Sequence, residues 1–277
     1  MGSKDAPKDV WASGDSYEPY VGRWSRLVAQ EFLAWLALPE GREWLDVGSG
    51  TGVLSQTILA VTNPKTVKGI DRSEEYVEFA RSQGSDPRAE FELGNAQSLP
   101  LESETFDAAV SGLVLNFVPY PNQMIAEMAR AVRDHGIVAL YVWDYAGKMQ
   151  MMRHFWNAAI TLDPAARDLD EGRRFPICNP DSLHDLFQNA ELSQVEVRPI
   201  DILAEFKDFD DYWFPFLGGQ GPAPGYVMSL SEKRRAQLRE RIYNSLPFAL
   251  DGMITLILRA WAVRGVKQAQ SRRRRIR

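Results

Sequence analysis

The fold is decided by the stretch Glu43-Trp44-Leu45-Asp46-Val47-Gly48-Ser49-Gly50-Thr51-Gly52. A short apolar run ends near an acid, a glycine-rich turn follows, and apolar residues resume directly after it. This order predicts a buried strand, a tight loop and the start of a helix. Alternate glycines remove the Cβ atoms that would hold a ligand away from the backbone, and a helix start presents backbone N–H groups. We therefore expect a ligand to lie flat against this loop.

Two classes of ligand use such a loop. The dinucleotide fingerprint requires glycines at the first, third and sixth positions, but the sixth position from Gly48 is Val53. The glycines instead stand at 48, 50 and 52, with Asp46 before them. This spacing resembles the first motif of class I S-adenosylmethionine (SAM)-dependent methyltransferases, in which the loop passes under the amino-acid part of SAM. The resemblance implies that Asp46, Gly48, Ser49, Gly50 and Gly52 bind this cofactor.

A second acid follows at the correct distance. The segment from Thr66 reads as a strand that ends at Asp71, which lies 23 residues beyond Gly48. In a βαβ unit the end of the second strand sits beside the first loop, so a carboxylate there can accept both ribose hydroxyls. Alternatively, Asp71 caps the next helix, from Ser73 to Gln83, although Ser73 can fill that role itself. We expect Asp71, with its neighbour Arg72, to contact the cofactor.

A third strand is expected over Ala89 to Leu93, followed by Asn95, Ala96 and Gln97. Methyltransferases of this kind often have Gly-Asp-Ala here, with the acid accepting from the adenine amino group. This chain has Asn95 instead, whose amide oxygen can still accept a hydrogen bond. The resemblance therefore implies that these three residues contact the adenine, while a plain polar turn remains an equally open interpretation of Asn95.

The segment from Glu104 to Val118 predicts the fourth strand and the loop after it. Its Phe-Asp start, small-residue turn and Asn-Phe pair resemble the family's fourth motif. Because ligands of such sheets bind at the carboxyl ends of the strands, we expect Ser111, Gly112 and Asn116 to face the sulfonium or the substrate. A helix over Gln123–Arg133 and a fifth strand over Ile137–Tyr145 follow.

A helix is expected from Tyr17 to Leu38, where most apolar residues share one face before Pro39-Glu40-Gly41 ends it. Its start is rich in aromatic residues. These rings either pack onto the core or form a lid in which Tyr20, Arg23 or Trp24 covers the cofactor. The methyltransferases that this chain resembles often cap SAM with such an N-terminal helix.

The rest of the chain predicts additions to one domain. A partly helical insertion is expected over about 146–179, and 207–250 forms a second one, in which Tyr212 to Pro222 reads as a loop from its glycine and proline content. Helices are expected over 181–189 and 231–245. Strand patterns at 194–206 and 254–263 fit an antiparallel hairpin. Residues 1–16 and the basic tail 266–277 are expected to be flexible, which leaves a single domain over 17–265.

Together the motifs cover Tyr17 to about Tyr145, and the chain resembles a class I SAM-dependent methyltransferase of the small-molecule subgroup called type 11. The resemblance implies an α/β, Rossmann-like three-layer sandwich with a mostly parallel seven-stranded sheet, an antiparallel C-terminal hairpin and cap insertions. It implies methyl transfer from SAM to an O, N or C atom of a small-molecule acceptor. The alternatives are a SAM-binding regulatory or scaffold protein without transferase activity and an NAD-dependent oxidoreductase.

An oxygen acceptor would need a base, and the candidates are Asp144, His154 and Asp211. Each also has an ordinary interpretation, such as a turn cap for Asp144 and a core or surface histidine for His154. The insertions carry large aromatic residues, which either line a pocket for a planar or lipophilic molecule or form the core of the cap. Phe155, Trp156, Trp213 and Phe216 are the examples.

The composition argues against several kinds of partner and site. The net charge is −5, which argues against binding nucleic acid through a basic face. A single cysteine excludes an internal disulfide, and no Cys/His cluster has metal-ligand spacing, so no metal is expected. No apolar run is long enough to cross a bilayer. We expect a cytoplasmic protein, monomeric or homodimeric, that is not bound to membranes.

Overall fold

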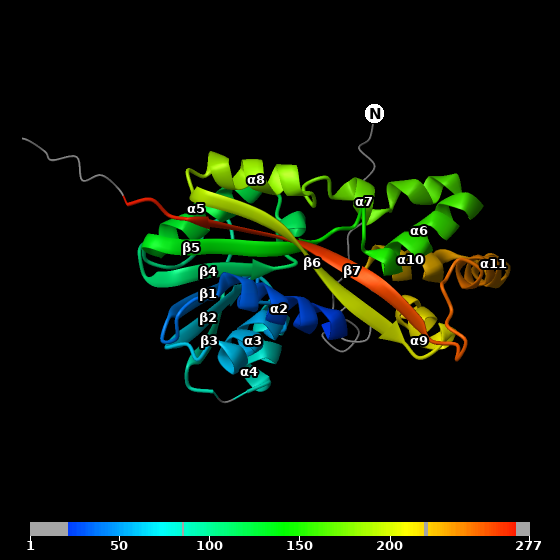
Figure 1. Ribbon diagram of the computed structural model, residues 1–277, viewed down its shortest axis with the longest axis horizontal. Coiled ribbons are helices and arrows are strands. Elements are labelled where there is room, and N and C mark those ends of the chain that lie inside the picture. The colour runs from blue at the N-terminus through cyan, green and yellow to red at the C-terminus, as the bar shows by residue number, and fades with distance from the viewer. Residues whose placement is uncertain (1–21, 85, 219–220, 270–277) are drawn as a thin grey trace, which may run out of the picture. The chain divides into compact units, whose positions relative to one another are not determined.

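The computed structural model describes residues 22–84, 86–218 and 221–269 (Figure 1). Tyr20, the flexible start expected over 1–16 and most of the basic tail lie outside the described residues. The chain divides into two compact units. Of the described residues, the sheet unit comprises 26–143, 177–200 and 260–269, whereas the cap unit comprises 22–25, 144–176 and 201–259. The single domain over 17–265 stays a prediction.

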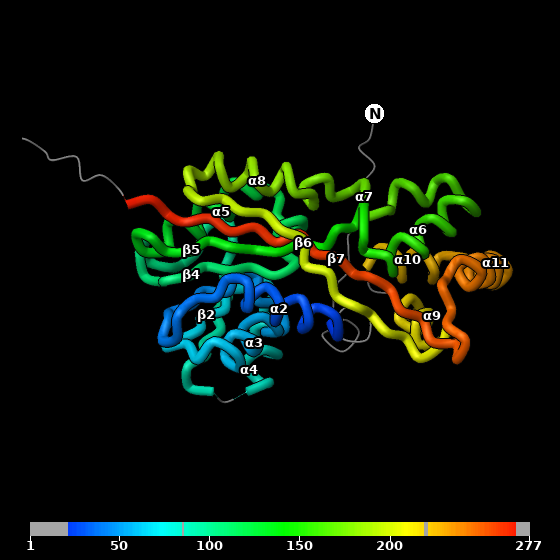
Figure 2. The backbone as a smooth tube through the Cα atoms, viewed as in Figure 1, coloured from blue at the N-terminus to red at the C-terminus, as the bar shows by residue number. Residues whose placement is uncertain are grey.

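The sheet has seven strands in the order β3-β2-β1-β4-β5-β7-β6. The first five strands pair in parallel, and β7 runs antiparallel to β5. Figure 2 shows β6 and β7 as neighbouring long strands. The predicted Rossmann-like class is thereby confirmed. The strands are β1 (Glu43–Val47), β2 (Thr66–Asp71), β3 (Ala89–Leu93), β4 (Phe106–Gly112), β5 (Val132–Trp143), β6 (Ser193–Phe206) and β7 (Ile254–Val266).

Helices of the sheet unit cover both faces of the sheet. The chain winds from β1 outward to β3, then returns to β4 and winds the other way, and right-handed crossovers put the two sets of helices on opposite faces. Figure 1 shows α5 and α8 together, apart from α3 and α4. These helices are α3 (Val53–Val61), α4 (Glu74–Ser82), α5 (Pro121–Ala131) and α8 (Pro180–Asn189), and α2 (Arg23–Leu36) contributes its residues from 26 on.

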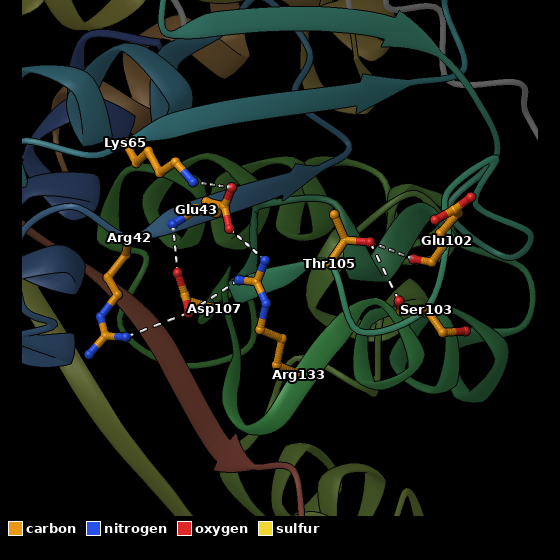
Figure 3. A network of polar contacts seen from close by, with 8 residues as sticks. All are labelled: Arg42, Glu43, Lys65, Glu102, Ser103, Thr105, Asp107 and Arg133. Atoms are coloured by element: carbon orange, nitrogen blue, oxygen red, sulfur yellow. Dashed lines mark hydrogen bonds and ion pairs between the residues drawn. The ribbon is translucent and has the colours of Figure 1, made fainter.

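Ion pairs fasten the amino-terminal ends of the strands (Figure 3). The Glu43 backbone N–H donates to Asp107 Oδ2 at 2.8 Å, and Arg133 lies 2.5 Å from Glu43 Oε2 and 3.3 Å from Asp107 Oδ1. Lys65 forms a further ion pair with Glu43, and Arg42 forms one with Asp107. The Arg133 hydrogen bond lowers the pKa of Glu43, with a smaller effect from Lys65. This end of the sheet is held by charges that satisfy one another, which leaves the carboxyl ends of the strands for a ligand.

The cap unit is helical and has an aromatic core. Phe155 and Phe216 stack with ring centroids 4.6 Å apart, and Trp156 packs edge-on against Phe155. All three are completely buried, so of the two interpretations of these aromatic residues the core is the one observed. The described helices are α6 (Gln150–Leu162), η3 (Pro164–Asp168), α7 (Glu171–Arg174), α9 (Phe209–Trp213), η4 (Phe214–Leu217), α10 (Pro222–Ser229) and α11 (Glu232–Tyr243).

The prediction of a loop over Tyr212 to Pro222 is wrong, because α9, η4 and the start of α10 occupy most of this segment. Proline stands in the first turn of both η4 and α10, where its missing N–H costs no hydrogen bond. Proline content therefore does not by itself distinguish a loop from the start of a helix.

In the described part of the chain, no helix combines the length and the apolar character that crossing a bilayer requires.

Candidate functional site

The glycine loop is shaped by positive backbone angles. Gly48 has a φ of 75°, and a Cβ there would lie 2.6 Å from a methyl carbon of Val114. Gly50 has a φ of 51°, yet its ideal Cβ would meet no described atom within 4 Å. The first glycine is thus required by packing inside the protein, whereas the second borders open space. A ligand can approach the backbone at Gly50.

The loop delivers the chain into the start of α3. Gly52, with a φ of 87°, occupies the cap position, and the described residues provide no side-chain hydrogen bond to this helix end. The Gly52 N–H donates to Ser49 O at 2.8 Å, which closes the loop. The first turn of a helix carries unsatisfied N–H groups and a partial positive charge. This end of α3 can therefore hold a negatively charged group of a ligand.

Asp71 ties the loop to the end of β2. Its Oδ2 accepts the Gly50 N–H at 2.8 Å and its Oδ1 accepts the Ser73 N–H at 2.9 Å. The Ser73 hydroxyl caps α4 by accepting from the Tyr76 N–H, as expected. Each carboxylate oxygen of Asp71 has lone pairs beyond the one in use. The acid is thus fixed beside the loop and can still accept hydrogen bonds from two ligand hydroxyls.

Three buried polar atoms of this region have no hydrogen-bond partner among the described residues. They are Asp46 Oδ1, Ser49 Oγ and Asn116 Nδ2, the last in the short helix η2 (Leu115–Phe117). Asp46 and Ser49 flank the end of β1, and η2 follows β4, which pairs with β1. An unpaired buried polar group costs about 1–3 kcal/mol, so native structures rarely leave one without a ligand or water. These atoms fit a polar ligand at the carboxyl ends of the strands.

Asp46 is the most perturbed acid of the site. Its side chain is fully buried, its Oδ2 accepts from the Ser55 hydroxyl at 2.7 Å, and burial raises its pKa from 3.8 to about 7. The nearby negative charge of Asp71 raises this pKa further, while the Ser55 hydrogen bond lowers it. Sequence reasoning did not identify Ser55, because nine residues separate it from Asp46. An ammonium group beside Asp46 would favour its ionised form.

Asp46→Asn is expected to stabilise the protein at pH 8 while weakening its affinity for S-adenosylhomocysteine. The folded pKa of about 7 lies above 3.8, so the folded state releases this proton late and wild-type stability falls as pH rises between these values. Between pH 5 and pH 8 the wild type therefore loses roughly 3 kcal/mol of stability that the variant does not lose. Urea unfolding at pH 5 and pH 8 measures it. A stability difference that is the same at both pH values would contradict this assignment.

The residues expected to contact adenine are engaged locally. Asn95 is exposed, and its Oδ1 accepts the Gln97 N–H at 3.0 Å, which is the polar-turn interpretation. Gln97 accepts the Tyr120 N–H at 3.2 Å through its Oε1. Ala96 is half-buried between them, and Arg72 is exposed beside Asp71. Their contacts with a cofactor stay predictions.

Ser111 and Gly112 lie at the carboxyl end of β4. The Ser111 hydroxyl donates to Val47 O at 2.6 Å, so it joins β4 to β1. A Cβ at Gly112 would lie 2.5 Å from the Tyr141 hydroxyl, so this glycine lets the ring of Tyr141 approach the strand. Both residues thus pack β4 against its neighbouring strands β1 and β5, and their contacts with the sulfonium or the substrate stay predictions.

The remaining predicted residues belong to the cap unit. Asp144 accepts the N–H groups of Gly147 at 3.0 Å and Lys148 at 2.8 Å, so it caps a turn after β5. Asp211 pairs with Arg23 at 3.0 Å. His154 Nδ1 lies 3.1 Å from the Ser245 hydroxyl, and burial lowers its pKa. Of the three proposed bases, the two acids are thus held by partners.

Arg23 and Trp24 are the first residues of α2 and belong to the cap unit. The Arg23 guanidinium lies over the Trp24 ring, with 4.3 Å between its carbon and the ring centroid. The expected role of these two residues as a lid over the cofactor is not tested by their contacts within the unit. Among the described residues, no group of three or more His, Cys, Asp or Glu could hold a metal ion.

Known proteins resemble this chain in sequence and fold. It is 27% identical over 219 residues to methyltransferase GfsG of Streptomyces halstedii, covering 77% of this chain and 76% of that protein. In three other curated relatives the match spans half of their length or less. Two solved structures share the fold. The YcgJ protein of Bacillus subtilis has a TM-score of 0.57 and 16% identity, covering 89% of this chain and 99% of its own.

The second structure is phosphoethanolamine N-methyltransferase 2 of Haemonchus contortus, solved in complex with S-adenosyl-L-methionine. Its TM-score is 0.57 at 14% identity, covering 95% of this chain and 62% of that chain. Residues 45–140, which run from the first strand of the sheet to the fifth, match the Methyltransf_11 family, described as a methyltransferase domain. Residues 45–140 are thus a methyltransferase domain of the type 11 family.

Proposed function

We propose that this protein transfers a methyl group from SAM to a small-molecule acceptor. The observation that carries the proposal is the set of buried polar atoms at Asp46, Ser49 and Asn116, which have no partner among the described residues and lie around an accessible glycine loop. A ligand with an ammonium group, a carboxylate and ribose hydroxyls would satisfy such atoms. The family match and the Haemonchus contortus enzyme, which binds SAM, support the same cofactor.

Each group of the site has a role in holding this cofactor. Asp71 accepts hydrogen bonds from the two ribose hydroxyls, and the start of α3 faces the carboxylate of the amino-acid part. Asp46 compensates the ammonium charge, and this contact keeps its carboxylate ionised. Asn116 donates from its buried Nδ2. The sheet unit by itself thus provides partners for the charged and hydroxyl groups of SAM.

The transfer step demands little acid–base chemistry from the protein. SAM supplies a methyl group that its positive sulfur already activates, so the residues need to align the acceptor and exclude water. An acceptor that loses a proton requires a base in addition. The candidates remain Asp144, His154 and Asp211, each of which has a partner within the cap unit, and burial lowers the pKa of His154.

A turnover measurement tests the proposal. The protein is incubated with SAM and a panel of phenols, carboxylic acids and amines, and S-adenosylhomocysteine is quantified with and without each acceptor. We expect acceptor-dependent product that is lost in Asp71→Asn. Binding of SAM with no product across the panel would favour a regulatory or scaffold protein instead. Binding of NAD in place of SAM would favour an oxidoreductase, although position 53 is valine rather than the glycine of the dinucleotide fingerprint.

A further inference from the structure

In the cap unit, one edge of the Arg23 guanidinium is buried and has no hydrogen-bond acceptor among the described residues. Arg23 Nη1 donates to Asp211 Oδ1 at 3.0 Å, but the Nε and Nη2 atoms of the same guanidinium are buried and have no hydrogen-bond partner among the described residues. Asp211 contacts the guanidinium through Nη1 alone, and its Oδ2 accepts the Lys207 N–H at 3.1 Å. Two donor atoms of a charged group are thus withdrawn from water without a hydrogen bond from the described residues, which is costly.

In other arginines of this chain the same edge donates either to backbone carbonyls, as in Arg81 and Arg235, or to carboxylates. In Arg259 the Nε and Nη2 atoms donate to the two oxygens of Asp201 at 2.6 and 2.7 Å. In Arg264 the same two atoms donate to a single oxygen, Glu196 Oε2, at 3.1 and 2.7 Å. These two parallel N–H groups match the geometry of a carboxylate. In Arg23 the equivalent edge is the part left unpaired.

The surroundings hold the Arg23 guanidinium in place. Its carbon lies 4.3 Å from the Trp24 ring centroid and 5.0 Å from that of Phe206, and the two rings pack edge-on at 5.4 Å. Cation–π contacts of this kind fix the plane of the group. Trp24 is only 7% exposed, and its own Nε1 also has no partner in the described chain. The arginine edge is therefore rigid before any ligand arrives, which favours binding.

We propose that the Nε/Nη2 edge of Arg23 binds a carboxylate of the methyl acceptor. A planar group with two oxygens satisfies both donors, and Asp211 holds the guanidinium from its other side. In the proposed function the carboxylate of SAM is held at the start of α3 in the sheet unit, which leaves Arg23 for a second acid. As a statement about the acceptor, this proposal rests on the proposed function, whereas carboxylate binding by Arg23 does not.

The test follows the Arg23 Nε–H signal in ¹⁵N–¹H NMR spectra of the full chain, assigned by its loss in Arg23→Lys. Benzoate and octanoate are the probes, benzamide is the neutral control, and each is titrated with and without saturating S-adenosylhomocysteine. We expect either acid to shift this signal, benzamide to leave it in place, and S-adenosylhomocysteine neither to shift it nor to block the acids. Arg23→Lys is expected to weaken benzoate binding about tenfold.

Arg239→Lys is the matched control. Arg239 also lies over an aromatic ring, Phe209, and pairs with an acid, Asp210, but the pair is exposed. This substitution should leave benzoate binding unchanged. A signal that moves with neither acid, or equally with benzamide, would overturn the proposal. A signal moved by S-adenosylhomocysteine would assign Arg23 to the cofactor and overturn the acceptor role. Absence of S-adenosylhomocysteine binding alongside a carboxylate-induced shift would sink the proposed function and leave the Arg23 subsite standing.

Discussion

Asp71→Asn is expected to lower the affinity for S-adenosylhomocysteine about a hundredfold, because hydrogen bonds to a charged group contribute about 1.5–3 kcal/mol each. The carboxylate of Asp71 accepts the N–H groups of Gly50 and Ser73 and, by our proposal, two ribose hydroxyls. An amide keeps one acceptor oxygen and turns its NH₂ group toward one of those N–H donors. Calorimetric titration of both proteins measures the loss.

The matched control for this substitution is Asp107→Asn. Asp107 also accepts a backbone N–H, that of Glu43 at 2.8 Å, but at the amino-terminal end of the strands. Both variants should lose stability in urea unfolding, and only Asp71→Asn should lose the ligand. Unchanged affinity in Asp71→Asn would remove the acid from the site. An equal loss in both variants would attribute the effect to general destabilisation of the sheet.

Gly50→Ala is expected to abolish most cofactor binding, by about a hundredfold or more, with a stability cost of only about 1–2 kcal/mol. The added methyl group meets no described atom within 4 Å, so the cost to the folded protein is confined to the positive φ of 51°. The same methyl group occupies the space in which the ligand lies flat against the loop. Titration with S-adenosylhomocysteine and thermal unfolding separate the two effects.

Gly41→Ala controls for backbone strain. Gly41 has a φ of 75°, and its ideal Cβ also meets no described atom within 4 Å, but it lies in the turn before β1. We expect the two variants to be destabilised to a similar extent and only Gly50→Ala to lose the ligand. If Gly50→Ala binds as tightly as Gly41→Ala, the ligand does not approach the loop at this position.

Local patterns predicted the elements that carry the loop. The strands at 43–47 and 89–93 and the helix start at Val53 are observed where the sequence indicated them. The transition from α5 to β5 was predicted at the wrong residues, because the helix ends at Ala131 and the strand already begins at Val132. Val132 pairs with Phe106 before a register shift, and His135 adopts a φ of 64°. Pairing with a distant strand determined this boundary, which no local pattern contains.

The candidate site likewise combines features that the sequence predicted with features that it did not predict. The positions of the glycine loop and of Asp71 follow from spacing, because the topology of parallel strands fixes where their ends meet. The state of Asp46 does not, since its raised pKa depends on burial and on a bond to Ser55 in the next helix. The side-chain contacts of Asn95 and Gln97 could not be predicted either, because each side chain accepts a hydrogen bond from a nearby backbone N–H group.

The most direct test of the central claim is a calorimetric titration of the purified chain with S-adenosylhomocysteine, and with NAD in parallel. We expect saturable binding of S-adenosylhomocysteine at one site per chain, lost in Gly50→Ala and retained in Gly41→Ala, and no binding of NAD. Binding of NAD, or no heat of binding with S-adenosylhomocysteine, would contradict this claim.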